Sequence, residues 1–142
     1  MKQSQKENNL STLTKDQKES LETFGEWLDT PYSFKPFVMK GFAGSGKTYL
    51  AMKFLKLVES SDFCWTVVAP THKAVGVLRK ALDLESIKPT WFPSTIHRLL
   101  RLKLKRKADI ELCEKTDQTE KSLDQLGLVL VDEASMIDTK LL

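Results

Sequence analysis

The sequence lacks the features that mark secreted, membrane and metal-binding proteins. It has only two cysteines, Cys64 and Cys113, which show neither metal-ligand spacing nor a disulfide framework. No apolar run approaches the length of a membrane span, and the polar N-terminus does not resemble a signal peptide. We therefore expect a reduced, intracellular, soluble protein in which Cys64, within an apolar segment, is a small core residue.

A strong charge of one sign is also lacking. The 22 basic and 19 acidic residues leave a net charge of +3, which is too small to identify a partner. The length of 142 residues fits one domain at most, and 41% hydrophobic with 29% charged residues is ordinary for a globular protein. Information about function must therefore come from local motifs.

Residues 41–48 form the most informative of these motifs. They read Gly-Phe-Ala-Gly-Ser-Gly-Lys-Thr and match the phosphate-binding loop pattern. Glycines allow backbone N–H groups to turn toward phosphate oxygens, and the helix that follows directs its positive end at the same site. Lys47 would reach the terminal phosphates, and the Thr48 hydroxyl would bind Mg²⁺. The residues expected to contact the nucleotide in this loop are Gly41, Ala43, Gly44, Ser45, Gly46, Lys47 and Thr48.

The flanking residues agree with this interpretation. Residues 37–40 are a short apolar segment typical of a strand, and apolar residues between 50 and 58 recur at helical spacing. A glycine-rich surface turn would need neither. The chain is therefore predicted to bind a nucleoside triphosphate.

An acidic pair follows a second apolar strand, at residues 127–131. Asp132 and Glu133 then lie at the carboxyl end of that strand, where ligands of α/β sheets collect. We expect Asp132 to hold Mg²⁺ through water, opposite Thr48, and Glu133 to polarise a water for attack on the γ-phosphate. This pair favours nucleotide hydrolysis, although the same two acids could instead cap a following helix.

Strands alternate with helices through the rest of the chain, which predicts an α/β fold with a parallel sheet and helices on both faces. We expect a flexible tail at 1–12, helices at 14–28, 72–82 and 94–100, a strand at 63–69, and a hairpin within residues 99–114 that turns near 106–108.

Gln17 has two explanations. With Thr14 it matches a capping box at a helix start, and its amide also suits the donor and acceptor of an adenine edge. Chemistry alone favours the cap.

Two polar segments lie at the starts of predicted helices. Pro70, Thr71 and His72 come after the strand at 63–69, and Thr71 could cap the next helix or contact a nucleic-acid phosphate. Ser94, Thr95 and His97 pose the same question, with Ser94 as a possible cap and His97 as a possible packed histidine.

Residues 98–107 carry six basic and no acidic side chains. The alternation would make one face of the hairpin cationic, which suits a polyanionic backbone, and Lys103, Lys105 and Arg106 are the candidate DNA contacts. Acidic residues of the segment 109–124 could equally neutralise that face across the hairpin.

Taken in order, these motifs resemble superfamily 1 DNA helicases of the RecD/Dda-like branch (superfamily 1B). Leu-Thr-Lys-Asp-Gln at 13–17 is similar to the adenine-reading Q motif, and residues 41–48 to motif I. Ala-Pro-Thr-His-Lys-Ala at 69–74 resembles motif Ia, Ser-Thr-Ile-His at 94–97 the segment after it, and Val-Asp-Glu-Ala-Ser-Met at 131–136 motif II.

The resemblance implies a RecA-like P-loop NTPase domain over residues 13–142, with ATP and Mg²⁺ as cofactors. It also implies a monomeric 5′ to 3′ motor that grips single-stranded DNA near Thr71 and His72 at a duplex junction, in a bacterial or phage-type context. It shifts Gln17 toward an adenine role and places a strand-separating pin at the hairpin, whose tip is basic here rather than aromatic.

The family continues beyond the point that corresponds to Leu142, with a Gly-Asp-x-x-Gln strand, a second RecA-like domain and arginines that reach the γ-phosphate. We therefore expect an incomplete domain from a longer helicase, inactive by itself. The alternatives are a nucleotide- or DNA-binding module without motor activity and a P-loop ATPase unrelated to DNA.

Overall fold

The computed structural model describes residues 13–30, 35–107 and 110–137. The chain divides into two compact units, Met1–Val58 and Glu59–Leu142, and each is described by itself. The tail expected at residues 1–12 lies outside the described residues.

The first unit contains the helices α2 (Lys15–Asp29) and α3 (Lys47–Glu59), the latter ending one residue beyond it. A cluster of aromatic rings joins them. Phe24 of α2 stacks on Phe54 of α3 with ring centroids 4.3 Å apart, and Phe37 meets both rings edge-on. Such pairs contribute roughly 0.5–1.5 kcal/mol each beyond the burial of their area. The cluster therefore holds the segment before the glycine loop against both helices.

The strand predicted at residues 37–40 is not present. The segment from 36 to 42 has no strand hydrogen bonds, and only Phe37 and Met39 of residues 37–40 are partly buried. An extended segment counts as a strand only when a neighbour accepts and donates its ladder hydrogen bonds, and the described residues of this unit supply two helices and no second strand. The helical spacing after the loop is confirmed, since Leu50, Ala51, Phe54, Leu55 and Val58 are all buried.

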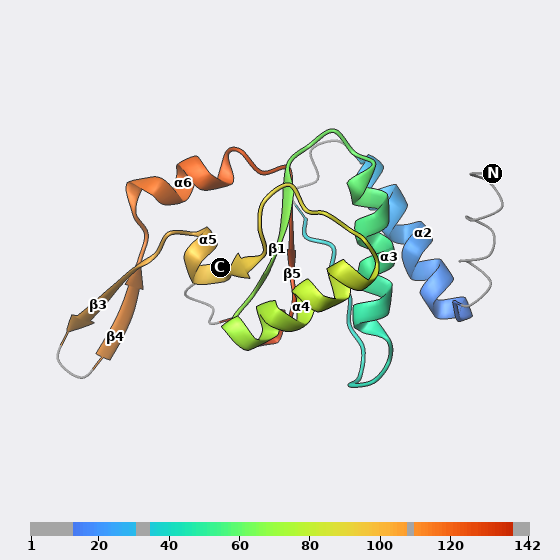
Figure 1. The fold of residues 1–142 in the computed structure, drawn as a ribbon, viewed down its shortest axis with the longest axis horizontal. Coiled ribbons are helices and arrows are strands. Elements are labelled where there is room, and N and C mark those ends of the chain that lie inside the picture. The colour runs from blue at the N-terminus through green and yellow to red at the C-terminus, as the bar shows by residue number, and fades with distance from the viewer. Residues whose placement is uncertain (1–12, 31–34, 108–109, 138–142) are drawn as a thin grey trace. The chain divides into compact units, whose positions relative to one another are not determined.

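The second unit is built on a parallel sheet of three strands in the order β2-β1-β5 (Figure 1). The strands are β1 (Trp65–Ala69), β2 (Ser94–Thr95) and β5 (Leu128–Val131). All five residues of β1 are buried, as expected for a central parallel strand that reads as a continuous apolar run. The two ladders align Val68 with both Ser94 and Val131, so the carboxyl ends of all three strands lie at one edge.

Helix α4 (His72–Leu84) packs on this sheet through Val75, Leu78 and Leu82, each at most 3% exposed. It continues two residues past the predicted end at Leu82. The sheet and helices form an α/β fold of the RecA-like P-loop class, as predicted.

The segment from Ser94 differs from prediction. Ser94 and Thr95 form strand β2 rather than the first helical turn, because they pair in parallel with Val68 and Ala69 of β1. Helix α5 (Ile96–Leu99) follows, and its cap is Thr95, whose hydroxyl accepts a hydrogen bond from the N–H of Arg98 at 3.3 Å. Ser94 is therefore not the cap.

A two-stranded antiparallel sheet is formed by β3 (Lys103–Lys107) and β4 (Ile110–Glu114), and it extends away from the parallel sheet (Figure 1). Its first strand begins at Lys103, later than the start of the predicted hairpin at 99–114, because Leu100 is the C-cap of α5. Helix α6 (Asp117–Leu123) and the 3-10 turn η1 (Ala134–Met136) complete the described elements.

Candidate functional site

The backbone of the glycine-rich loop depends on its glycines. Gly44 and Gly46 have φ values of 75° and 80°, in the left-handed region that glycine tolerates best. A Cβ atom on Gly41 would lie 2.6 Å from the Ser45 Oγ atom. The loop is therefore a cradle that side chains at these positions would strain or fill.

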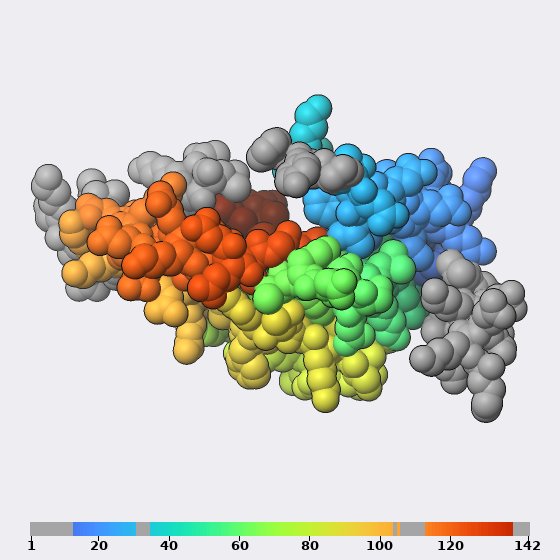
Figure 2. All heavy atoms as spheres, turned by 90° about the horizontal axis from the view of Figure 1, so that it is seen from above, coloured from blue at the N-terminus to red at the C-terminus, as the bar shows by residue number. Residues whose placement is uncertain are grey.

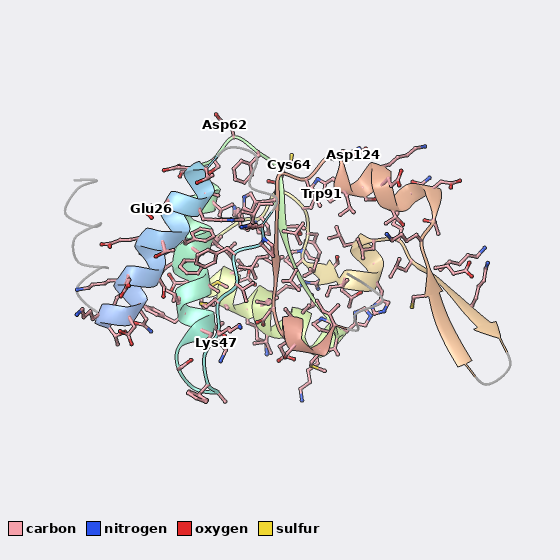
Figure 3. All side chains as sticks on the ribbon, turned by 180° about the vertical axis from the view of Figure 1, so that it is seen from behind. Glu26, Lys47, Asp62, Cys64, Trp91 and Asp124 are labelled. Carbon is pink, nitrogen blue, oxygen red and sulfur yellow. The ribbon has the colours of Figure 1, made fainter. Side chains whose placement is uncertain are left out.

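Lys47, the first residue of α3, points back into this loop (labelled in Figure 3). Its ammonium group donates hydrogen bonds of 2.7 Å to the carbonyl oxygens of Gly41 and Phe42. The first turn of α3 contains no acidic residue, so the positive end of the helix is not compensated there. A cation and uncompensated N–H groups at one helix start suit a polyphosphate.

Gln17 lies beside the loop in the same unit. Its side-chain oxygen accepts from the Thr14 N–H at 3.0 Å, and its own N–H donates to the Thr14 hydroxyl at 3.3 Å, which confirms the capping box. Its amide nitrogen lies 2.9 Å from the position of a Cβ atom on Gly46. Among the described residues this nitrogen has no hydrogen-bond partner, so the capping role leaves its donors available at the loop.

Asp132 and Glu133 directly follow β5. The N–H of Asp132 donates to the carbonyl oxygen of Val68 at 2.9 Å, which extends the ladder between β5 and β1 by one residue. Asp132 is half-buried and Glu133 is exposed. Glu133 has a φ of 51°, a backbone conformation that costs a non-glycine residue roughly 1–2 kcal/mol. Such strain in a polar residue at a sheet edge is typical of functional sites.

The structure brings several predicted DNA-contact residues to that same edge. Pro70, Thr71 and His72 follow β1, and the Thr71 hydroxyl accepts from the Ala74 N–H at 3.2 Å, which confirms that it caps α4. His97 follows β2 and is exposed, so it is not a packed core histidine.

A groove of about 690 Å³ lies next to this edge within the second unit. Its lining joins four basic side chains to aromatic, apolar and hydroxyl groups, and no carboxylate is among the described residues that line it. The lining residues are His72, Val75, Arg79, Trp91, Phe92, Pro93, Ser94, Thr95, Arg98, Leu99, Arg101 and Ser122. A surface of this composition attracts anions and offers ring faces for stacking.

The hairpin is less clearly cationic than predicted. Lys105 forms an ion pair with Glu114 of the opposite strand, and both side chains are about half exposed. The cross-strand neutralisation that the sequence left open therefore applies to Lys105. Lys103 is exposed, and the side chain of Arg106 is not among those that the structure describes.

The sequence model of a family described as AAA domain matches residues 28–142. The chain belongs to this AAA domain family. It is also 34% identical over 124 residues to a protein of Acanthamoeba polyphaga mimivirus named "Uncharacterized protein R530". That alignment includes 75% of this chain and 24% of the viral protein, so the chain spans about a quarter of that relative's length.

Membership of the AAA domain family makes the chain a P-loop ATPase domain, of a family that generally uses ATP and Mg²⁺. Within the described residues no three His, Cys, Asp or Glu side chains gather at metal-binding distance. The loop nevertheless fits Mg²⁺–ATP, because Mg²⁺ keeps several waters and takes most other ligands from phosphates. Thr48, in the first turn of α3, carries the hydroxyl expected to bind Mg²⁺. No helix in the described part of the AAA domain is long and apolar enough to cross a membrane.

Sequence reasoning missed several residues of the groove in this AAA domain. The motifs assigned no role to Trp91, Phe92 or Arg79. Arg98 and Arg101 were counted in a basic run without a role. A Trp-Phe pair close to a basic run was the available signal in the sequence, since basic patches interleaved with aromatic side chains are typical of nucleic-acid binding.

Proposed function

We propose that this chain is the first motor domain of an ATP-dependent DNA helicase, of the RecD/Dda-like branch of superfamily 1. The observation that carries the proposal is the shared sheet edge in the second unit. Thr71 and His72 follow β1, Ser94 and Thr95 end β2, and the Asp132–Glu133 pair follows β5. Residues for nucleotide hydrolysis and for nucleic-acid contact therefore lie at the ends of adjacent strands, where a motor couples the two.

In this proposal the loop and the acids have separate roles. Lys47 and the loop amides would hold the phosphates, and Thr48 and Asp132 would hold Mg²⁺. Glu133 accepts a proton from the water that attacks the γ-phosphate. The left-handed backbone of Glu133 supports this role, because the residue is exposed and packing does not account for its conformational cost.

The DNA-contact surface consists of the residues at this edge together with the groove beside it. His72, Ser94 and Thr95 line the groove with three arginines and no acid among the described lining residues, which supports a phosphate backbone as the ligand. Movement 5′ to 3′ and separation of a duplex, with Lys103, Lys105 and Arg106 on the hairpin near the junction, are proposed from the family resemblance.

The proposal is tested by measuring ATP hydrolysis with and without single-stranded DNA in the protein that carries this domain. We expect DNA to stimulate hydrolysis, and Glu133→Gln to retain ATP binding while hydrolysis is lost. Hydrolysis that DNA does not change would favour a P-loop ATPase unrelated to DNA. Binding of both ligands without hydrolysis would favour a non-motor binding module.

A further inference from the structure

Phe92 presents an aromatic ring to solvent at the rim of the groove. Its side chain is 76% exposed, although phenylalanine is normally a core residue. One face of the ring is covered by Arg79, whose guanidinium carbon lies 4.2 Å from the ring centroid. A stacked cation on one face and high exposure overall leave the other face of the ring open.

The segment that carries this ring is fixed to the sheet by several hydrogen bonds. The Trp91 N–H donates to the carbonyl oxygen of Trp65 at 3.2 Å, and the buried Thr66 hydroxyl donates to the carbonyl oxygen of Trp91 at 3.0 Å. Arg79 donates to the carbonyl oxygen of Pro93 at 2.8 Å. The residues directly before and after Phe92 in the chain are therefore both fixed by hydrogen bonds. Stacking of a base on the Phe92 ring would then cost little ordering entropy.

The backbone at Arg101, a second arginine of the groove, is held by the chain around it. Arg101 has a φ of 49°, which is uncommon for a non-glycine residue, and its carbonyl oxygen accepts from the Thr116 hydroxyl at 3.0 Å. Next to it, the Leu100 carbonyl oxygen accepts from the Thr119 hydroxyl of α6 at 2.6 Å. Figure 2 shows the segment of α6 against the segment that precedes β3. Arg98 lies one turn earlier in α5 and lines the same groove.

We propose that Phe92 is a stacking platform for an unpaired base of single-stranded DNA, with Arg98 and Arg101 as contacts to the adjoining phosphates. Arg79 holds the ring in place from its covered face, and so acts as a positioning residue. The groove suits this ligand because its lining combines cations with an open ring face, and the described lining residues include no acid. This subsite rests on the proposed function for its DNA ligand and adds the residue that contacts a base.

The test uses the protein that carries this domain and two fluorescently labelled probes, an oligo(dT) about 12 nucleotides long and an abasic strand of the same length. Fluorescence anisotropy gives the affinity for each. Phe92→Ala should weaken oligo(dT) binding about 10-fold and leave abasic binding unchanged, because only oligo(dT) has bases to stack. Phe92→Trp should retain the wild-type affinity. Replacing Arg98 and Arg101 with alanine should weaken the binding of both probes and lower the salt dependence of that binding.

The matched control is Leu84→Ala, which removes a side chain that is 86% exposed and does not line the groove, and should leave both affinities unchanged. If the wild-type chain binds oligo(dT) and abasic DNA equally, or if Phe92→Ala binds oligo(dT) as tightly as wild type, the stacking platform is excluded while DNA binding stands. If the wild-type chain binds neither probe, the proposed DNA function fails and the subsite fails with it.

Discussion

The amide nitrogen of Gln17 lies 2.9 Å from the point where a side chain on Gly46 would begin. One residue thus closes the start of α2 through its side-chain oxygen and faces the phosphate loop through its nitrogen. Capping and nucleotide contact are therefore compatible uses of the same amide, and the two can be separated by substitution.

Thr14→Ala and Gln17→Ala both break the capping box, and loss of the Thr14 cap should destabilise the chain by roughly 0.5–2 kcal/mol. Only Gln17→Ala should also weaken ATP binding, by several-fold, because only it removes the amide beside the loop. Thermal unfolding and titration with a fluorescent ATP analogue measure the two effects. Equal ATP affinities in the two variants would mean that Gln17 is a cap alone.

Lys47→Ala should weaken binding of Mg²⁺–ATP at least 10-fold, because it removes the ammonium group that two loop carbonyls hold at the phosphate site. Lys40→Ala is the matched control, since it removes the same charge from an exposed residue just before the loop. Isothermal titration calorimetry measures the affinity of both variants for Mg²⁺–ATP. A similar loss in the two would show that general charge, and not the position of Lys47, drives binding.

Glu133→Gly should stabilise the fold while it abolishes hydrolysis. Relief of the left-handed backbone, about 1–2 kcal/mol, exceeds the entropic cost of glycine, about 0.5–1 kcal/mol, so we expect a net gain near 0.5–1 kcal/mol in the free energy of unfolding. Urea denaturation measures this change in the free energy of unfolding. Glu133→Gln keeps the strain and should leave stability unchanged. A less stable glycine variant would show that Glu133 makes compensating contacts and is not strained for function.

Replacing Lys103, Lys105 and Arg106 with alanine tests whether the hairpin binds DNA. For every side chain that binds a phosphate, its removal should lower the salt slope of single-strand binding by about 0.7. Lys105 already has Glu114 as a partner, so Glu114→Gln should strengthen DNA binding by releasing it. An unchanged affinity and slope in the triple variant would exclude the hairpin from the DNA-contact surface.

The sequence predicted those parts of the fold in which local pattern and tertiary environment agree. The apolar run of β1 becomes a fully buried central strand, and Thr14 and Thr71 cap the helices that their spacing predicts. The prediction that Ser94 begins a helix was wrong, because pairing with Val68 competes with helix formation. That pairing depends on a strand that is distant in the sequence. Local propensity cannot register that competition.

The candidate site divides in the same way. Motif spacing indicates the phosphate loop and the acidic pair, because their chemistry requires particular residue types in a row. The groove could not be predicted from motif spacing. Arg79 and Phe92 come into contact only when α4 packs on the sheet and the loop before β2 is hydrogen-bonded to β1. The left-handed backbone of Glu133 and Arg101 likewise has no signature in residue type.

The central claim is that one chain binds both Mg²⁺–ATP and single-stranded DNA, at separate residues. The most direct test titrates the protein that carries this domain with a fluorescent ATP analogue and with labelled oligo(dT), for wild type, for Lys47→Ala and for Arg98→Ala combined with Arg101→Ala. We predict that wild type binds both ligands, that Lys47→Ala loses the nucleotide alone, and that the double arginine variant loses DNA alone. Nucleotide binding by a wild-type chain that has no affinity for DNA would contradict the claim.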